Sequence, residues 1–148
     1  MACDKLGMYV MDEFADQWLI HKNPYDYADA DFRKNWQQDL RAMVLKNYNH
    51  PSVIMNSIGN EISELALPEG QEYCRKMAEF VRSIDPSRPV TLGVNLMLCS
   101  MTAKGGGIYG DKKDKKGKKK ETRMEARQWT MLLPVLFQYV DEYSRWND

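Results

Sequence analysis

The sequence lacks the features that mark membrane, secreted or nucleic-acid-binding proteins. No stretch of its 148 residues approaches the ~20 consecutive apolar residues that a transmembrane helix needs. No apolar leader segment follows Met1, so we expect a cytoplasmic protein with no membrane partner. Basic and acidic residues number 21 each, and this balance gives no reason to expect nucleic acid or a strongly acidic partner.

Cysteine is also scarce. Cys3, Cys74 and Cys99 form an odd set, and their spacing matches neither a disulfide framework nor a metal site. We therefore expect free or buried thiols in a reducing compartment, with no metal and no cofactor.

The length fits one domain with a sizeable core, but the composition changes near residue 100. We expect a folded unit over residues 1–100, a disordered Gly/Lys-rich loop over 101–121 and a helix over 122–148. The lysines of the loop could neutralise phosphates, but aromatic and arginine residues are not interleaved with them. A solvated insertion is the better interpretation of this segment.

The first hundred residues alternate between two kinds of apolar pattern. Short apolar runs at residues 8–11, 53–58 and 90–94 predict buried strands. Between them, residues 31–48 and 69–84 repeat apolar side chains every three or four positions, which predicts two amphipathic helices. This order predicts an α/β fold in which a βαβαβ unit forms a parallel sheet. The expected buried faces of the two helices are Phe32, Trp36, Leu40, Met43, Val44 and Asn47, then Tyr73, Met77, Phe80, Val81 and Ile84.

Acidic and amide side chains follow two of these strands. Asn60 and Glu61 come after the central apolar run, and Asp12 and Glu13 come after the first. Ligands bind at the carboxyl ends of parallel strands, and a carboxyl group partly shielded from water there suits proton donation. Structural alternatives remain open: a turn before a helix for Asn60 and Glu61, and a salt bridge or helix cap for Asp12 and Glu13.

The loops between these elements give two further expectations. Glu64 is expected to be solvated, because it lies on the loop after Glu61. The aromatic residues Trp18, Tyr25 and Tyr27 lie in the loop after the first strand, where they could stack on a ligand or pin the loop; pinning is the favoured interpretation.

The segment from Asn49 to Glu61, NHPSVIMNSIGNE, closely resembles the acid/base segment of glycoside hydrolase family 2, the β-galactosidase and β-glucuronidase family. Residues 7–13, 22–27 and 85–91 also resemble that family, and the likeness extends over about residues 3–95. It implies part of a TIM barrel and a retaining β-glycosidase acting on a carbohydrate.

The resemblance also implies roles for single residues. Glu61 would be the general acid/base and Asn60 would hydrogen-bond to the sugar, while Asp12 and Glu13 would line the substrate site. The sequence departs from the family at Asn56, where the family usually has Trp.

Several parts of such an enzyme are missing from the sequence. A complete eight-stranded barrel needs roughly 200 residues or more, and nothing after Asn95 resembles the strand that carries the nucleophile. We therefore expect little or no turnover by this chain alone. The alternative is a non-catalytic truncated α/β module. In either case the open strand edges favour self-association, pairing with a partner chain or capping by the C-terminal helix.

Overall fold

The computed structural model describes residues 2–23 and 25–105. It contains three strands, β1 (Val10–Glu13), β2 (Val53–Asn60) and β3 (Val90–Gly93), which are parallel and lie in that order. The loop predicted over 101–121 begins too early, because residues 101–103 are helical; the rest of it from residue 106 and the helix predicted over 122–148 lie outside the described residues.

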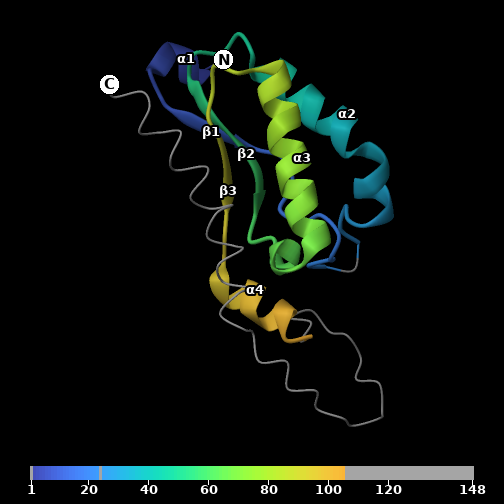
Figure 1. Cartoon of the computed structure of the whole chain (residues 1–148). Coiled ribbons are helices and arrows are strands. Elements are labelled where there is room, and N and C mark those ends of the chain that lie inside the picture. Colours follow the sequence, from blue (N-terminus) through green and yellow to red (C-terminus); the bar gives the residue numbers. More distant parts are fainter. Residues whose placement is uncertain (1, 24, 106–148) are drawn as a thin grey trace, which may run out of the picture.

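Two long helices connect the strands, and both lie on the same face of the sheet. Helix α2 (Ala30–Asn47) follows β1 and helix α3 (Pro68–Ile84) follows β2, and they pack side by side against the sheet (Figure 1). Strands in chain order with every crossover on one face are the arrangement of a barrel segment, whereas a doubly wound sheet carries helices on both faces. The predicted βαβαβ unit is confirmed, and its sheet is not closed.

The predicted apolar face of α2 is the centre of the core. All six of its expected residues are buried, and the ring of Phe32 is stacked on Trp18 with ring centroids 6.1 Å apart. From α3, Tyr73 meets both Phe32 and Trp36 edge-on. The loop that follows the first strand, which contains Trp18, is thereby tied to the two helices.

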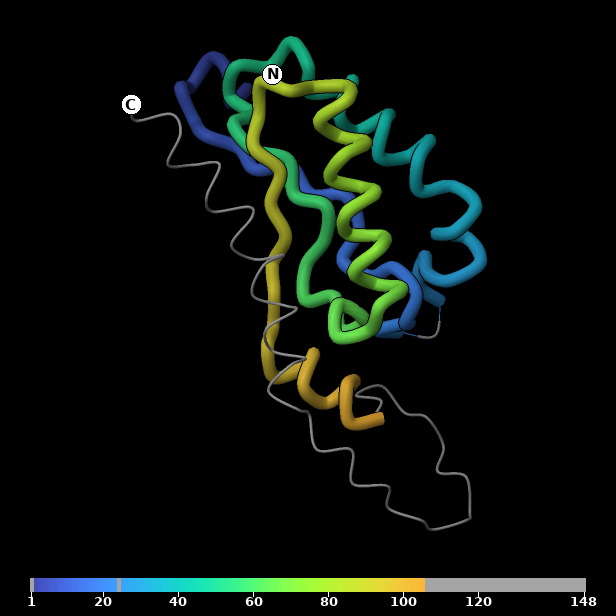
Figure 2. Tube along the Cα trace, viewed as in Figure 1, coloured from blue at the N-terminus to red at the C-terminus, as the bar shows by residue number. Residues whose placement is uncertain are grey.

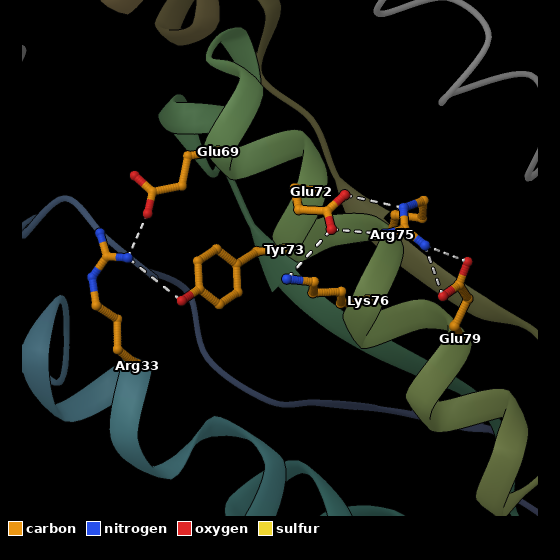
Figure 3. Close-up of polar contacts among 7 residues, drawn as sticks. All are labelled: Arg33, Glu69, Glu72, Tyr73, Arg75, Lys76 and Glu79. Carbon is orange, nitrogen blue, oxygen red and sulfur yellow. Dashed lines mark hydrogen bonds and ion pairs between the residues drawn. The ribbon is translucent and has the colours of Figure 1, made fainter.

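The outer surface of the two helices carries a row of ion pairs (Figure 3). Arg33 of α2 reaches Glu69 at the start of α3, and within α3 Arg75 lies between Glu72 and Glu79. These side chains are half exposed, and exposed pairs of this kind contribute little stability. The ion pairs mark the solvated side of the two amphipathic helices.

The trace in Figure 2 shows the two ends of the sheet clearly. A short 3₁₀ helix, η1 (Ser63–Ala66), and helix α4 (Leu96–Ala103) lie where β2 and β3 end. Helix α1 (Ala2–Leu6) lies at the opposite end. None of these three elements was predicted, because each is too short for its apolar period to be read from the sequence.

One local prediction needs correction. The first strand begins at Val10 rather than at Met8, because Met8 and Tyr9 are exposed and have no core to enter. Before α2, the side chain of Asp29 makes no capping bond to the helix and pairs with Arg33. No helix in the described part of the chain is long and apolar enough to cross a membrane.

Arg88 joins the two turns that enter β2 and β3. Its guanidinium donates to the backbone carbonyls of Tyr48, His50 and Val53 and to the carboxylate of Asp85. This side chain is only 13% exposed, and that of Asp85 is 1% exposed. The turn before β3 is therefore held by a buried, charge-assisted cluster.

Candidate active site

The end of β2 contains an extra residue relative to its neighbour β3. Ser57 pairs with Thr91 and Asn60 pairs with Gly93, so three steps along β2 match two along β3. Side chains alternate between the faces of a sheet, and without this bulge Asn60 would face the helices. The bulge turns Asn60 to the other face, over Gly93, where an added Cβ would lie 2.5 Å from its Oδ1.

The next residue, Glu61, has a backbone conformation that residues other than glycine rarely adopt. Its φ is 51°, in the left-handed region that favours glycine. Two bonds hold this conformation: the Glu61 N–H donates to the Gly93 carbonyl at 2.8 Å, and Lys22 Nζ donates to the Asn60 carbonyl at 2.8 Å. Residues held in such backbone conformations cluster at functional sites, where the surrounding contacts fix their direction.

The Glu61 carboxyl group is partly exposed and has a defined partner. Asn95, two residues after the end of β3, donates from its side-chain nitrogen to Glu61 Oε1 at 2.9 Å. The side chains of Glu61 and Asn95 thus meet at this corner of the sheet, and the side chain of Asn60 lies over Gly93 beside it. Asn95 was not predicted as a site residue, although a polar residue directly after a buried strand is the same signal that identified Glu61.

The loop between β1 and α2 is attached to the end of β2 at three points. Trp18 Nε1 donates to the Ile58 carbonyl at 3.1 Å, and Lys22 reaches Asn60. Glu64 supplies the third: its Oε1 accepts from the backbone N–H groups of Leu19 and Ile20 at 2.6 and 3.3 Å. Pinning is therefore the role of Trp18.

The prediction that Glu64 is solvated is wrong. Its side chain is 2% exposed, because the folded loop gives the carboxylate two backbone donors and Ser63 adds a hydroxyl contact. Backbone donors from a distant loop leave no signal in the local sequence. Tyr25, from the same loop, is fully exposed, and the hydroxyl of Tyr27 donates to Asp39 at 2.8 Å.

The two acidic residues of β1 lie on opposite faces of the sheet. Glu13 pairs with Ser57 on the face away from the helices and accepts a hydrogen bond from its hydroxyl at 3.0 Å. Along the sheet it lies short of Asn60 by the length of two residues of β3, roughly 7 Å at ~3.3 Å per residue.

Asp12 faces the helices. It accepts from Lys46 Nζ and Asn47 Nδ2, both at 2.7 Å. Burial raises the pKa of the Asp12 carboxyl, but the hydrogen bonds from Lys46 and Asn47 outweigh burial and hold this pKa below its usual value. These contacts match the salt-bridge alternative, and they separate Asp12 from Asn60, Glu61 and Asn95.

Asn56, where the family resemblance leads one to expect Trp, lies on the same helix-covered face. It pairs in register with Asp12 and Val90 and is 1% exposed, and neither atom of its amide group has a hydrogen-bond partner. The departure from the family pattern is thus a packing change beneath the sheet, away from the corner where Asn60 and Glu61 lie.

This corner can transfer a proton. A partly exposed carboxyl group, fixed by a neighbouring amide at the carboxyl end of parallel strands, is placed as a general acid/base is in an α/β barrel. Across residues 2–23 and 25–105, no cluster of three or more His, Cys, Asp or Glu side chains could hold a metal ion. The fold defines a segment of an α/β barrel, and the corner lies at the carboxyl end of its strands.

The family follows from comparison with known proteins. The family model for the TIM barrel domain of glycosyl hydrolases family 2 matches residues 1–131, and the chain belongs to this family. A β-galactosidase of Bacteroides ovatus, BoGH2A, is 36% identical over 63% of this chain. A putative β-glucuronidase of Formosa agariphila is 38% identical over 62% of it.

A solved structure gives the same result for the fold. The glycosyl hydrolase family 2 member from Bacteroides cellulosilyticus is 50% identical, with a TM-score of 0.61 over 64% of this chain. The matched regions are only 14%, 8% and 12% of the three relatives. The chain thus corresponds to a small part of each, and the described sheet is part of a TIM barrel.

Proposed function

We propose that this chain carries the acid/base half of a glycosidase active site. Glu61 is the general acid/base and Asn60 hydrogen-bonds to the sugar beside the reacting carbon, while Glu13 lines the floor of the site. The single observation that carries the proposal is the corner at the end of β2, where a left-handed backbone and the Asn95 amide fix the Glu61 carboxyl group.

The chemistry is that of a retaining glycosidase. Glu61 donates a proton to the glycosidic oxygen while the bond from this oxygen to the sugar carbon breaks and a second carboxylate attacks that carbon. Glu61 then takes a proton from the water that releases the sugar. Names of the relatives support a β-galactoside or β-glucuronide as the substrate class. The nucleophile comes from outside this chain.

The decisive experiment places this segment in a complete enzyme. In BoGH2A, the matching region is replaced by residues 3–95 of this chain, and hydrolysis of phenyl and dinitrophenyl β-galactosides is measured. Glu61→Gln is expected to lower turnover of the phenyl glycoside about 100- to 10,000-fold, because its leaving group needs a proton. Dinitrophenolate leaves without a proton, so the glycosylation rate with the dinitrophenyl glycoside is expected to fall far less.

The matched control is Glu79→Gln, which removes an exposed carboxylate on the outer surface of α3. It is expected to leave both rates unchanged. An unaltered phenyl glycosidase rate in Glu61→Gln would contradict the proposal. The full 148-residue chain, assayed alone, is expected to turn over little; a folded hybrid with no activity at all would favour the non-catalytic alternative.

A further inference from the structure

Asn95 makes two sets of hydrogen bonds with the two ends of one amide group. Its Oδ1 accepts from the backbone N–H groups of Met97 and Leu98, at 3.1 and 3.2 Å, and so caps the start of α4. Its Nδ2 donates to Glu61 Oε1 at 2.9 Å. The residue therefore joins the first turn of α4 to the carboxyl group after β2.

The cap determines which way round the amide lies. The oxygen of an asparagine side chain only accepts and its nitrogen only donates. If the amide were flipped, its NH₂ group would face two backbone N–H donors, and Glu61 would face an oxygen. The helix start therefore requires the observed orientation, with the donor toward Glu61.

The rest of the fold keeps Asn95 in place. Helix α4 is anchored by buried Leu98 and Cys99, and the Cys99 thiol lies 3.7 Å from the Ile62 carbonyl, one residue beyond Glu61. On the other side, the Glu61 N–H is bonded to Gly93, two residues before Asn95. Both partners of the side-chain contact are thus fixed through their own backbones.

We propose that Asn95 is a positioning residue that determines which oxygen of Glu61 exchanges the proton with substrate. Asn95 can only donate to Oε1, so this oxygen is an acceptor in both protonation states and the proton of the acid form resides on Oε2. Proton donation and proton acceptance then occur at one atom. The inference rests on the proposed role of Glu61 and assigns Asn95 no contact with the sugar.

The test is NMR of the full chain at pH 7, with the side-chain amide protons of Asn95 and the side-chain carboxyl carbon of Glu61 observed. Glu61→Ala removes the acceptor, and the Asn95 amide protons are then expected to exchange with water about 10-fold faster, because a bond to a carboxylate protects them. Asn95→Asp keeps a capping oxygen but, once ionised, has no donor, and it is expected to shift the carboxyl carbon resonance of Glu61.

The controls separate this effect from general changes in charge or fold. Asn35→Asp adds the same charge on α2 as Asn95→Asp and is expected to leave the Glu61 carbon resonance in place. Lys22 and Glu64, the charged residues on the adjoining loop and on η1, are the same in every variant. Glu79→Ala removes an exposed carboxylate on α3 and is expected to leave the exchange of the Asn95 amide protons unchanged.

Unchanged exchange of the Asn95 amide protons in folded Glu61→Ala would overturn the proposal. This variant decides the question even if Asn95→Asp does not fold. No substrate is involved, so the result is independent of glycosidase activity. Failure of the exchange test and failure of the hydrolysis test are therefore distinguishable.

Discussion

Two buried asparagines on the helix-covered face differ in what their amide groups contact. Asn47 donates to Asp12, while both amide atoms of Asn56 are without a partner. A buried polar group that loses its water and gains nothing costs about 1–3 kcal/mol. The side chain of Asn56 therefore lowers the stability of the fold, whereas that of Asn47, which is equally buried, raises it.

This contrast gives opposite expectations for the same substitution. Asn56→Leu is expected to raise the free energy of unfolding by about 1–2 kcal/mol, because it removes an unpaired amide without emptying the space. Asn47→Leu is expected to lower it by about 1–3 kcal/mol, because Asp12 loses a donor. Urea denaturation of the two variants beside the unmutated chain measures both. A larger loss in Asn56→Leu than in Asn47→Leu would contradict the assignment.

At the scale of elements, two arginines connect segments that are distant in sequence. Arg88 binds the carbonyls before β2 and the buried carboxylate of Asp85, whereas Arg33 joins α2 to Glu69 of α3 at the solvated surface. Burial decides what each connection contributes. When an exposed ion pair is broken, water solvates both charged groups. A buried carboxylate that loses its partner has no water to take the partner's place.

Arg88→Met is therefore expected to destabilise the chain by about 3 kcal/mol, since it leaves the buried charge of Asp85 without its cation and removes a donor from three carbonyls. Arg33→Met is expected to change stability little, and less still at high salt. Unfolding by urea at low and high ionic strength distinguishes the two. Equal losses in both variants would show that burial is not what separates them.

At the scale of the whole molecule, the sequence predicted the sheet and the two long helices because their apolar periods are long and regular. The buried face of α2 was predicted completely, whereas α4, with eight residues and apolar side chains nearly all round, has no period to detect. Glu61 followed from its place after a strand. The contacts of Lys22, Glu64 and Asn95 did not, because they join residues 34 to 45 positions apart.

The stability of the fold is expected to fall at low pH, because the carboxyl groups of Asp12 and Asp85 ionise more easily in the folded chain than in the unfolded one. Burial raises the pKa of Asp85, but the hydrogen bonds of Ser87 and Arg88 outweigh it and hold this pKa below its usual value; Asp12 behaves alike. The ionised forms therefore stabilise the fold fully above the unfolded value of about 3.9. This stabilisation is lost as the pH falls through the lower, folded values.

The free energy of unfolding is accordingly expected to be level between about pH 7 and 5 and to fall steadily below about pH 4. Asp85→Asn is expected to be less stable at pH 7 and to show a shallower fall in acid. Urea denaturation over this pH range, with Asp31→Asn as the exposed control, provides the measurement. Parallel curves for Asp85→Asn and the unmutated chain would exclude Asp85 as a source of the acid sensitivity.

The bulge at the end of β2 limits how this segment can change over evolution. Three steps of β2 match two of β3 just before Glu61, so the number of residues there decides which way Asn60 faces. Losing a single codon between Ser57 and Asn60 would turn that amide into the packed interior while leaving the strand intact. Substitutions can accumulate along this strand. A change in its length, however, turns Asn60, on which substrate recognition is proposed to depend, to the opposite face of the sheet.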